Sequence, residues 1–116
     1  MTTPYAQSEA QSRRTMTAAA RNTKTGEVFY GTSGKPWPAE IHPQVRSQLP
    51  EVSLQKWGVL NCAELQTCNI ALLDTKGTAL ADLEFVVVRT SDGVPQTPCL
   101  NCQQSLRGAT HLGERP

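Results

Sequence analysis

Cysteines are the residues of this chain whose type and spacing are best suited to chemistry, and the chain has four of them. Cys99 and Cys102 follow Pro98 in the sequence PCLNC, which is typical of the first turn of a helix. In such a turn both thiolates can reach one metal ion at about 2.3 Å. Cys62 is expected at the start of another helix, where the helix dipole also favours a thiolate. The pattern therefore predicts three sulfur ligands around one ion.

Cys68 is the fourth cysteine, and its position bears on whether the site is structural or catalytic. It stands six residues after Cys62. On a helix this is a displacement of about 9 Å along the axis and about 240° around it. One tetrahedral zinc ion cannot bridge that separation, so we expect Cys68 in the hydrophobic core. Three protein ligands with an open fourth position are typical of catalytic zinc.

Glu64 is the acidic residue nearest to the predicted ligands. On a helix it projects about 200° away from Cys62. Side chains of a first turn tilt toward the N-terminal end, however, so the two groups can converge above the helix tip. A carboxyl group beside a metal ion can take up and return protons. The alternatives are a redox pair or half of a structural zinc site for Cys99 and Cys102, and a solvated helix residue for Glu64.

The elements that must position these residues follow from turn signals and apolar patterns. Asn61 stands where the N-cap of the longest helix belongs. Leu65, Cys68 and Leu72 form the apolar stripe of that helix and are expected to face the sheet. The run over 83–88 is apolar on both faces at its centre, as in an interior strand with helices on each side. The expected elements are strands over 15–20, 27–30 and 83–88 and helices over 43–49, 62–73 and 97–108. This order predicts an α/β fold with a mixed central sheet and helices on both faces.

Length and composition limit the class of protein. The chain has 116 residues, 38% of them hydrophobic, and a formal net charge of +1. We expect one domain over 1–116 with a loosely held polar lead-in over 1–14. We expect neither a membrane span nor a secretory signal, because no apolar run has the required length or place. The near-neutral charge argues against binding nucleic acid by bulk electrostatics.

Two motifs carry a resemblance to a known family. Cys62-Ala63-Glu64 and Pro98-Cys99-Leu100-Asn101-Cys102 resemble the signature of the zinc-dependent cytidine deaminase superfamily, which is His or Cys, any residue and Glu, followed by Pro-Cys, two residues and Cys. With the loop Gly31-Thr32-Ser33-Gly34 and the form Asn-Cys-Ala-Glu, the chain is most similar to the YwqJ-like bacterial toxin deaminases. The resemblance covers roughly residues 26–108.

The resemblance implies a cytidine deaminase-like three-layer α/β/α fold and hydrolysis of cytosine to uracil. It implies one Zn²⁺ per chain held by Cys62, Cys99 and Cys102. Glu64 would be the catalytic proton shuttle, and the backbone N–H of Ala63 would meet the carbonyl of the base. Single-stranded DNA is the favoured substrate, with double-stranded DNA and RNA left open. The family also implies a toxin domain that acts in the cytoplasm of a target cell. Such a domain would be secreted or injected within a longer polypeptide, and an immunity protein would neutralise it.

Further substrate contacts are expected from residues near the motifs. Asn61 is an N-cap that could also touch a sugar or base. Ser33 and Tyr30 lie in the loop and strand end that precede the motif helix, and they are candidate substrate contacts although the pattern favours a structural role for both. For Trp37 and Trp57 the pattern favours structural packing over pocket lining.

Positive charge gathers before Gly26, and it could attract phosphates if it folds against the rim of the pocket. The basic residues are Arg13, Arg14, Arg21 and Lys24. His42 and His111 lie far from the motifs in the sequence, so surface or capping roles are expected for them.

Three functions stay open from the sequence. They are a cytosine deaminase of polynucleotides, a deaminase of free cytidine or nucleotides, and a non-catalytic zinc-binding module that binds a partner. We expect a monomer, and a monomer that binds single-stranded oligonucleotides would favour the first function. A tetramer with shared pockets would favour the second. Zinc binding and folding without deamination would leave the third.

Overall fold

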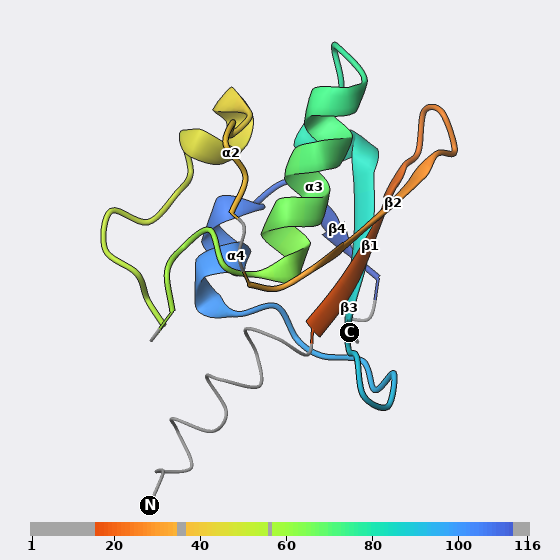
Figure 1. Cartoon of the computed structure of the whole chain (residues 1–116). Coiled ribbons are helices and arrows are strands. Elements are labelled where there is room, and N and C mark those ends of the chain that lie inside the picture. The colour runs from red at the N-terminus through yellow and green to blue at the C-terminus, as the bar shows by residue number, and fades with distance from the viewer. Residues whose placement is uncertain (1–15, 35–36, 56, 113–116) are drawn as a thin grey trace, which may run out of the picture.

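The computed structural model describes residues 16–34, 37–55 and 57–112 of the chain (Figure 1). In chain order its elements are β1 (Met16–Asn22), β2 (Val28–Thr32), α2 (Pro43–Arg46), α3 (Ala63–Asp74), the 3-10 helix η1 (Leu80–Asp82), β3 (Leu83–Arg89), α4 (Leu100–Ser105) and β4 (Thr110–His111). The predicted order of two strands, two helices, a strand and a helix is confirmed, and β4 follows it.

Four strands form one mixed sheet in the order β2-β1-β3-β4. β1 pairs antiparallel with both β2 and β3, whereas β3 and β4 are parallel. The predicted hairpin is therefore confirmed, with Gly26 at a φ of 78° in its turn. β3 is an interior strand, as the apolar run over 83–88 indicates. The fold is thus α/β with a mixed sheet.

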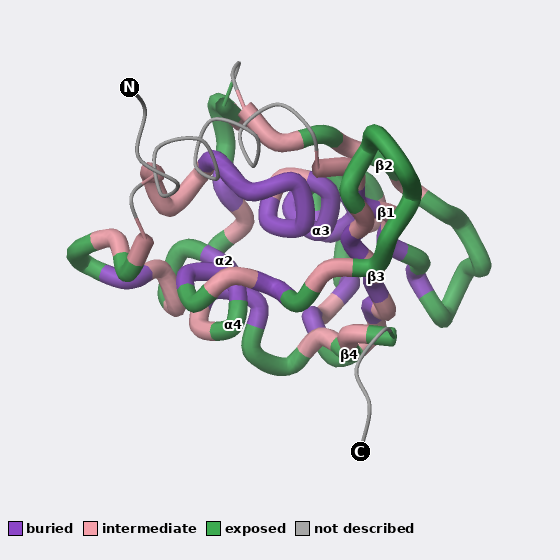
Figure 2. The backbone as a smooth tube through the Cα atoms, turned by 90° about the horizontal axis from the view of Figure 1, so that it is seen from below, coloured by how far each residue is buried: buried purple, intermediate pink, exposed green. Residues whose placement is uncertain are grey.

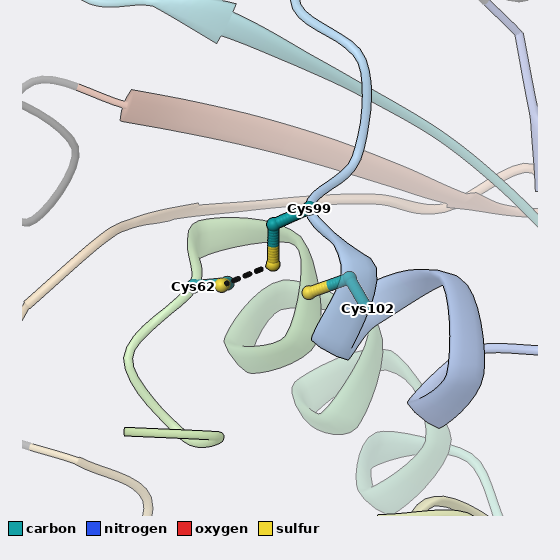
Figure 3. A group of neighbouring side chains, drawn as sticks. All are labelled: Cys62, Cys99 and Cys102. Carbon is teal, nitrogen blue, oxygen red and sulfur yellow. Dashed lines mark hydrogen bonds between the residues drawn. The ribbon is translucent and has the colours of Figure 1, made fainter. Parts of the chain in front are cut away.

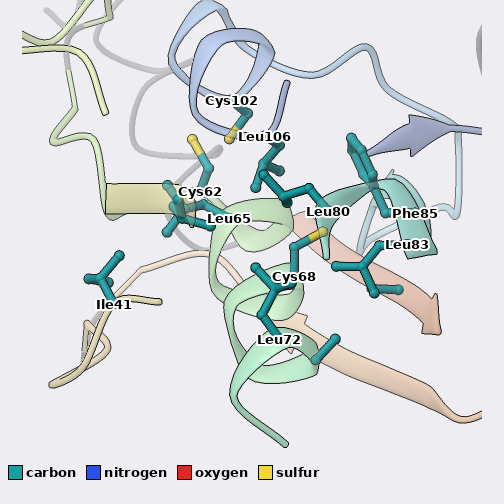
Figure 4. Close-up of a cluster of buried hydrophobic side chains, with 13 residues drawn as sticks. Ile41, Cys62, Leu65, Cys68, Leu72, Leu80, Leu83, Phe85, Cys102 and Leu106 are labelled. Atoms are coloured by element: carbon teal, nitrogen blue, oxygen red, sulfur yellow. The ribbon is translucent and has the colours of Figure 1, made fainter. Parts of the chain in front are cut away.

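The helices pack on one face of this sheet (Figures 1 and 2). The buried side chains of β1 and β3 alternate along each strand and are Ala18, Ala20, Asn22, Leu83, Phe85 and Val87. Val45 from α2, Leu65 from α3 and Leu106 after α4 belong to one buried cluster with residues of this face (Figure 4). The core therefore lies between the sheet and helices α2, α3 and α4.

The opposite face of the sheet differs from the expectation of helices on both faces. Tyr30 on that face is 71% exposed, and Val86 and Val88 are half-buried. Within the described residues no helix covers it (Figure 2). The described residues thus form two layers, one sheet and one layer of helices. Neighbouring strands shield the two valines in part, so their partial burial does not require a second layer of helices.

α3 lies at the centre of the core. Leu65, Cys68 and Leu72 are at most 1% exposed, so the predicted apolar stripe is buried. Where α3 meets β2, Gly31 lies directly against Thr67, and a Cβ atom at Gly31 would collide with the Thr67 hydroxyl. A strand residue without a side chain therefore lets helix and strand approach closely.

The start of α3 corrects one prediction. Its N-cap is Cys62, not Asn61. The side-chain oxygen of Asn61 accepts a hydrogen bond from the Trp37 indole at 3.1 Å, so it is directed toward the loop instead of the helix end. The helix consequently begins one residue later than its N-cap signal indicates.

The two short helices also differ from their predicted bounds. α2 begins at Pro43, and the His42 ring accepts a hydrogen bond from the Gln44 backbone at 3.2 Å, which confirms a capping role for His42. α2 ends at Arg46 and not at residue 49. α4 begins only at Leu100, because Cys99 has an extended backbone and is the N-cap. No helix in the described part of the chain has the length and apolar character needed to cross a membrane.

Candidate metal centre

Three cysteine sulfur atoms lie together where α3 and α4 begin (Figure 3). Cys62 is the N-cap of α3, Cys99 is the N-cap of α4, and Cys102 lies in the first turn of α4. Neither N-cap side chain caps its own helix. The three Sγ atoms all lie within 4.8 Å of one another, and those of Cys62 and Cys99 are 3.0 Å apart. The structure thus brings together the three residues that the sequence predicts as ligands.

This donor set fits a zinc ion. Four-coordinate zinc with Zn–S bonds of about 2.3 Å places its sulfur ligands about 3.8 Å apart. The separations here, from 3.0 Å to at most 4.8 Å, span that value. Cys68 is fully buried and does not belong to the group, so its predicted place in the core is confirmed (Figure 4).

Hydrogen bonds couple the three thiols electrostatically. Those from Cys102 and Cys62 lower the pKa of Cys99 to about 3. Burial, followed by hydrogen bonds with the other two sulfurs, raises the pKa of Cys102. The hydrogen bond with Cys102 lowers the pKa of Cys62, but the one with Cys99 together with burial outweighs it and raises that pKa. These opposite shifts favour the thiolate form at Cys99 over the other two sulfurs.

Trp57 contacts the sulfur group directly. Its indole N–H donates to Cys62 Sγ at 3.1 Å, and the same indole contributes to lowering the pKa of Cys99. The ring is partly buried against the core and also lines the cavity described below. The sequence favours packing for this residue, and no spacing in it indicates the contact with sulfur.

Glu64 lies in the first turn of α3 and is only 4% exposed. Burial, followed by the charge of Cys99, raises the pKa of its carboxyl group to about 7. The backbone N–H groups of Glu64 and Cys99 oppose this shift. Glu64 lines the same cavity as Cys62 and Cys99. The interpretation of Glu64 as a solvated helix residue is therefore wrong.

A cavity of about 360 Å³ lies beside Glu64, Cys62 and Cys99. Four amide side chains line it, namely Gln55, Asn61, Gln96 and Gln103. Apart from the carboxyl group and the thiols, no ionisable side chain is among the described residues that line it. The volume lies at the small end of the range for ligand sites in proteins, about 300–1,000 Å³, so the cavity can hold one small ligand.

Most of the predicted substrate contacts lie at this cavity. Ser33, Asn61 and Ala63 all line it. The side-chain amide of Gln66 donates to the backbone carbonyls of Gly34 and Leu60 at 2.9 and 3.0 Å, which ties the Ser33 loop to the start of α3. Trp37 reaches the site indirectly, since its indole binds the Asn61 side chain.

Tyr30 does not lie at the cavity, which corrects its prediction as a substrate contact. Side chains alternate along a strand. Because Gly31 faces α3, the neighbouring Tyr30 points to the opposite face of the sheet, where it is 71% exposed.

The described basic residues of the N-terminal region do not lie at the cavity either. Arg21 pairs with Glu84 at 3.5 Å and Lys24 with Asp82 at 3.4 Å. Both belong to the end of the hairpin near the C-terminal end of α3, away from the sulfur group (Figure 1). Arg13 and Arg14 lie outside the described residues.

His111 lies in β4, apart from the sulfur group. Its ring is 5.3 Å from that of Phe85, centroid to centroid. It does not belong to the candidate metal site.

No family model, curated protein or solved structure matches the chain. Function is therefore inferred from the geometry of the site and from the resemblance of its motifs.

Proposed function

We propose that the chain is a zinc-dependent hydrolytic deaminase that converts cytosine to uracil in nucleic acid, with single-stranded DNA as the favoured substrate. The observation that carries the proposal is the buried Glu64 carboxyl group beside three cysteine sulfurs that lie within 4.8 Å of one another. A purely structural zinc site is normally closed by a fourth protein ligand. Here the described residues supply three ligands, a carboxyl group and a cavity.

Cys62, Cys99 and Cys102 would hold the zinc ion, and Cys62 and Cys99 line the same cavity as Glu64. Bound zinc supplies the acidification of water that attack on an aromatic amidine carbon requires. Cys62 is the N-cap of α3, and the positive end of the helix dipole at that position favours a negatively charged ligand set.

Glu64 performs the proton transfers in this proposal. The attacking water gives a proton to the carboxylate, and the carboxyl group passes it to the ring nitrogen N3. A second proton from the same oxygen then moves through Glu64 to the exocyclic amine, which leaves as ammonia when the C4–N bond breaks. Water and cytosine are thereby converted to uracil and ammonia, and Glu64 ends in its starting protonation state.

The cavity supports a base as the group that is bound. Asn61 and Ser33 offer neutral polar groups, and Trp57 offers an aromatic face. Ala63 is the first residue of α3, and an N–H at that position has no acceptor within its helix. It is thus suited to donate to the carbonyl oxygen of the base.

The choice of a polynucleotide rests on the resemblance to the toxin deaminases, as do the three-layer fold, delivery within a longer polypeptide and neutralisation by an immunity protein. For the three-layer fold, the helices of the second face would have to come from outside the described residues.

The test incubates the zinc-loaded chain with single-stranded DNA, double-stranded DNA, RNA and free cytidine. Conversion of cytosine to uracil raises the mass of a substrate by about one unit for each base. We expect activity on single-stranded DNA, and a loss of at least about 100-fold in Glu64→Gln, which keeps the size of the side chain but cannot shuttle protons. Cys68→Ala is the matched control and should retain activity, because Cys68 lies in the core.

Each remaining outcome has a definite meaning. Activity confined to free cytidine would replace the polynucleotide substrate by a nucleoside and keep the chemistry. Full activity in Glu64→Gln would contradict the mechanism. Zinc binding without deamination of any substrate would leave a non-catalytic zinc module.

A further inference from the structure

The segment just before α3 is held by a side chain from inside the second cysteine motif. Asn101 stands between Cys99 and Cys102 and is fully buried. Its amide nitrogen donates to Ser53 Oγ at 2.9 Å, and its amide oxygen accepts from the Leu54 backbone N–H at 2.8 Å. A buried amide with both ends engaged fixes the position of the group it binds.

Ser53 links Asn101 to Trp57. The Ser53 hydroxyl donates to the backbone carbonyl of Trp57. A second link joins the same segment to α4, since the Gln55 side chain accepts from the Leu100 backbone N–H at 3.1 Å. Trp57 is thus tied to the helix that carries Cys102, although its own indole binds Cys62 at the start of α3.

The charge of the site explains why this indole matters. Three thiolates carry one more negative charge than a divalent ion neutralises, and the Glu64 carboxyl group lies beside them. Among the described residues that line the cavity there is no lysine or arginine to compensate. N–H dipoles can compensate part of this charge, and the Trp57 indole is a side-chain donor placed on a ligand sulfur at 3.1 Å.

We propose that Trp57 is a positioning residue of the metal centre. Held through Ser53 by Asn101, its indole N–H donates to the Cys62 sulfur, strengthens metal binding and sets the electronic character of that metal–sulfur bond. This inference rests on the proposed metal site, and it adds a residue that neither cysteine motif contains. Hydrogen-bond partners of metal ligands typically change metal affinity by 10- to 100-fold when they are removed.

The test titrates the full chain with Co²⁺ and records the sulfur-to-cobalt charge-transfer band and the dissociation constant. We expect Trp57→Phe to weaken binding by about 10-fold or more. We also expect the band to move to lower energy, because a sulfur without the hydrogen bond gives up its electrons more readily. Trp37→Phe is the matched control, since its indole donates to Asn61 and not to sulfur. It should leave both quantities unchanged.

Ser53→Ala separates the donor from the segment that holds it. This variant keeps the indole but removes the link to Asn101, so we expect a smaller shift of the band in the same direction. A change of fold alone would not move the charge-transfer band selectively to lower energy in both variants.

A measurement on the intact site keeps the inference testable if Trp57→Phe does not fold. In the Trp37→Phe protein, loaded with ¹¹³Cd and labelled with ¹⁵N in tryptophan, the remaining indole proton is that of Trp57. We expect a scalar coupling between this proton and cadmium, transmitted through the hydrogen bond to Cys62 Sγ.

Two results overturn the inference, and they differ from each other. Absence of this coupling, or an unchanged affinity and band in Trp57→Phe, would overturn the role of Trp57 and leave the metal site standing. Absence of any metal binding by the unaltered chain would overturn the metal site, and the role of Trp57 with it.

Discussion

The Sγ atoms of Cys62 and Cys99 lie 3.0 Å apart although the two residues are 37 positions apart in the chain. The contact exists because each residue is the N-cap of a helix, and the two helices begin at the same place (Figure 3). An N-cap residue has an extended backbone, so its side chain is not committed to the helix surface. The approach of two helix starts, more than the local CxxC spacing, is what completes the group of three sulfurs.

The zinc content of the purified chain should depend on the cysteines of this group and not on Cys68. We expect about one zinc ion per purified chain, and loss of that ion in Cys62→Ser and in Cys99→Ser. Cys68→Ala should keep it, because Cys68 is buried away from the group. Elemental analysis by mass spectrometry after exhaustive dialysis measures this directly. Equal zinc content in Cys99→Ser and the unaltered chain would show that the ion is held elsewhere.

Once a chelator has removed zinc, oxidation should join Cys62 to Cys99. The short separation of Cys62 and Cys99 favours a disulfide between them, which lowers the mass by about two units. Peptide mapping after treatment with diamide identifies the pair. Zinc should protect the chain, since ligated sulfur is not free to attack. A bridge that includes Cys68 would contradict the arrangement, because that thiol is fully buried.

The contact between Gly31 and Thr67 predicts a test of helix–sheet packing. Gly31→Ala should lower the free energy of unfolding by about 1–3 kcal/mol, because the new methyl group meets the Thr67 hydroxyl. Thr67→Ala removes that hydroxyl, so the double variant should be more stable than the sum of the two single effects indicates. Urea unfolding of the four proteins gives the coupling. Strict additivity would mean that α3 and β2 do not approach as closely as described.

Asp82 predicts how stability depends on pH. Its carboxylate accepts from the Ala79 backbone N–H at 2.8 Å and pairs with Lys24 at 3.4 Å. The backbone hydrogen bond is the largest influence and lowers its pKa below the ordinary value of 3.8, burial opposes this shift, and Lys24 adds to the lowering. A lowered pKa stabilises the fold above the unfolded pKa, and this contribution is lost as the pH falls through the folded value.

The comparison with Asp82→Asn isolates that contribution. The unaltered chain should be the more stable of the two at neutral pH, and the difference should shrink as the pH falls below 3.8. Chemical unfolding at a series of pH values measures it. A difference that grows in acid would have the wrong sign for a lowered pKa.

Local spacing was enough to predict that Cys99 and Cys102 act as a pair and that Cys68 cannot join Cys62, whereas the approach of Cys62 to that pair depends on two helix starts that meet. Cys99 and Cys102 are three residues apart, and Cys68 lies on the wrong side of the helix that Cys62 caps, so helix geometry alone separates Cys68 from the group. The hairpin and the interior strand were equally readable, because a glycine turn and a β-branched run are local signals.

Other features depend on contacts that no local pattern encodes. Asn61 has the type of an N-cap, but the indole of Trp37 takes its oxygen. Tyr30 lies close to the site in sequence and faces away from it, because Gly31 is the residue that packs on α3. Trp57 acquires its contact with sulfur only through a segment held by Asn101 from the other motif. Each of these outcomes is decided by a partner distant in the chain.

The uncharged character of the cavity lining, Glu64 and the thiols aside, has a consequence for ionic strength. A neutral base held by amides, a hydroxyl and an indole makes no charge pair there, so added salt should change its affinity little. Binding of polynucleotide phosphates, by contrast, releases counterions and weakens steeply with salt. The salt dependence of the affinity for a polynucleotide, compared with that for a free nucleoside, would therefore give the number of phosphate contacts made outside the cavity.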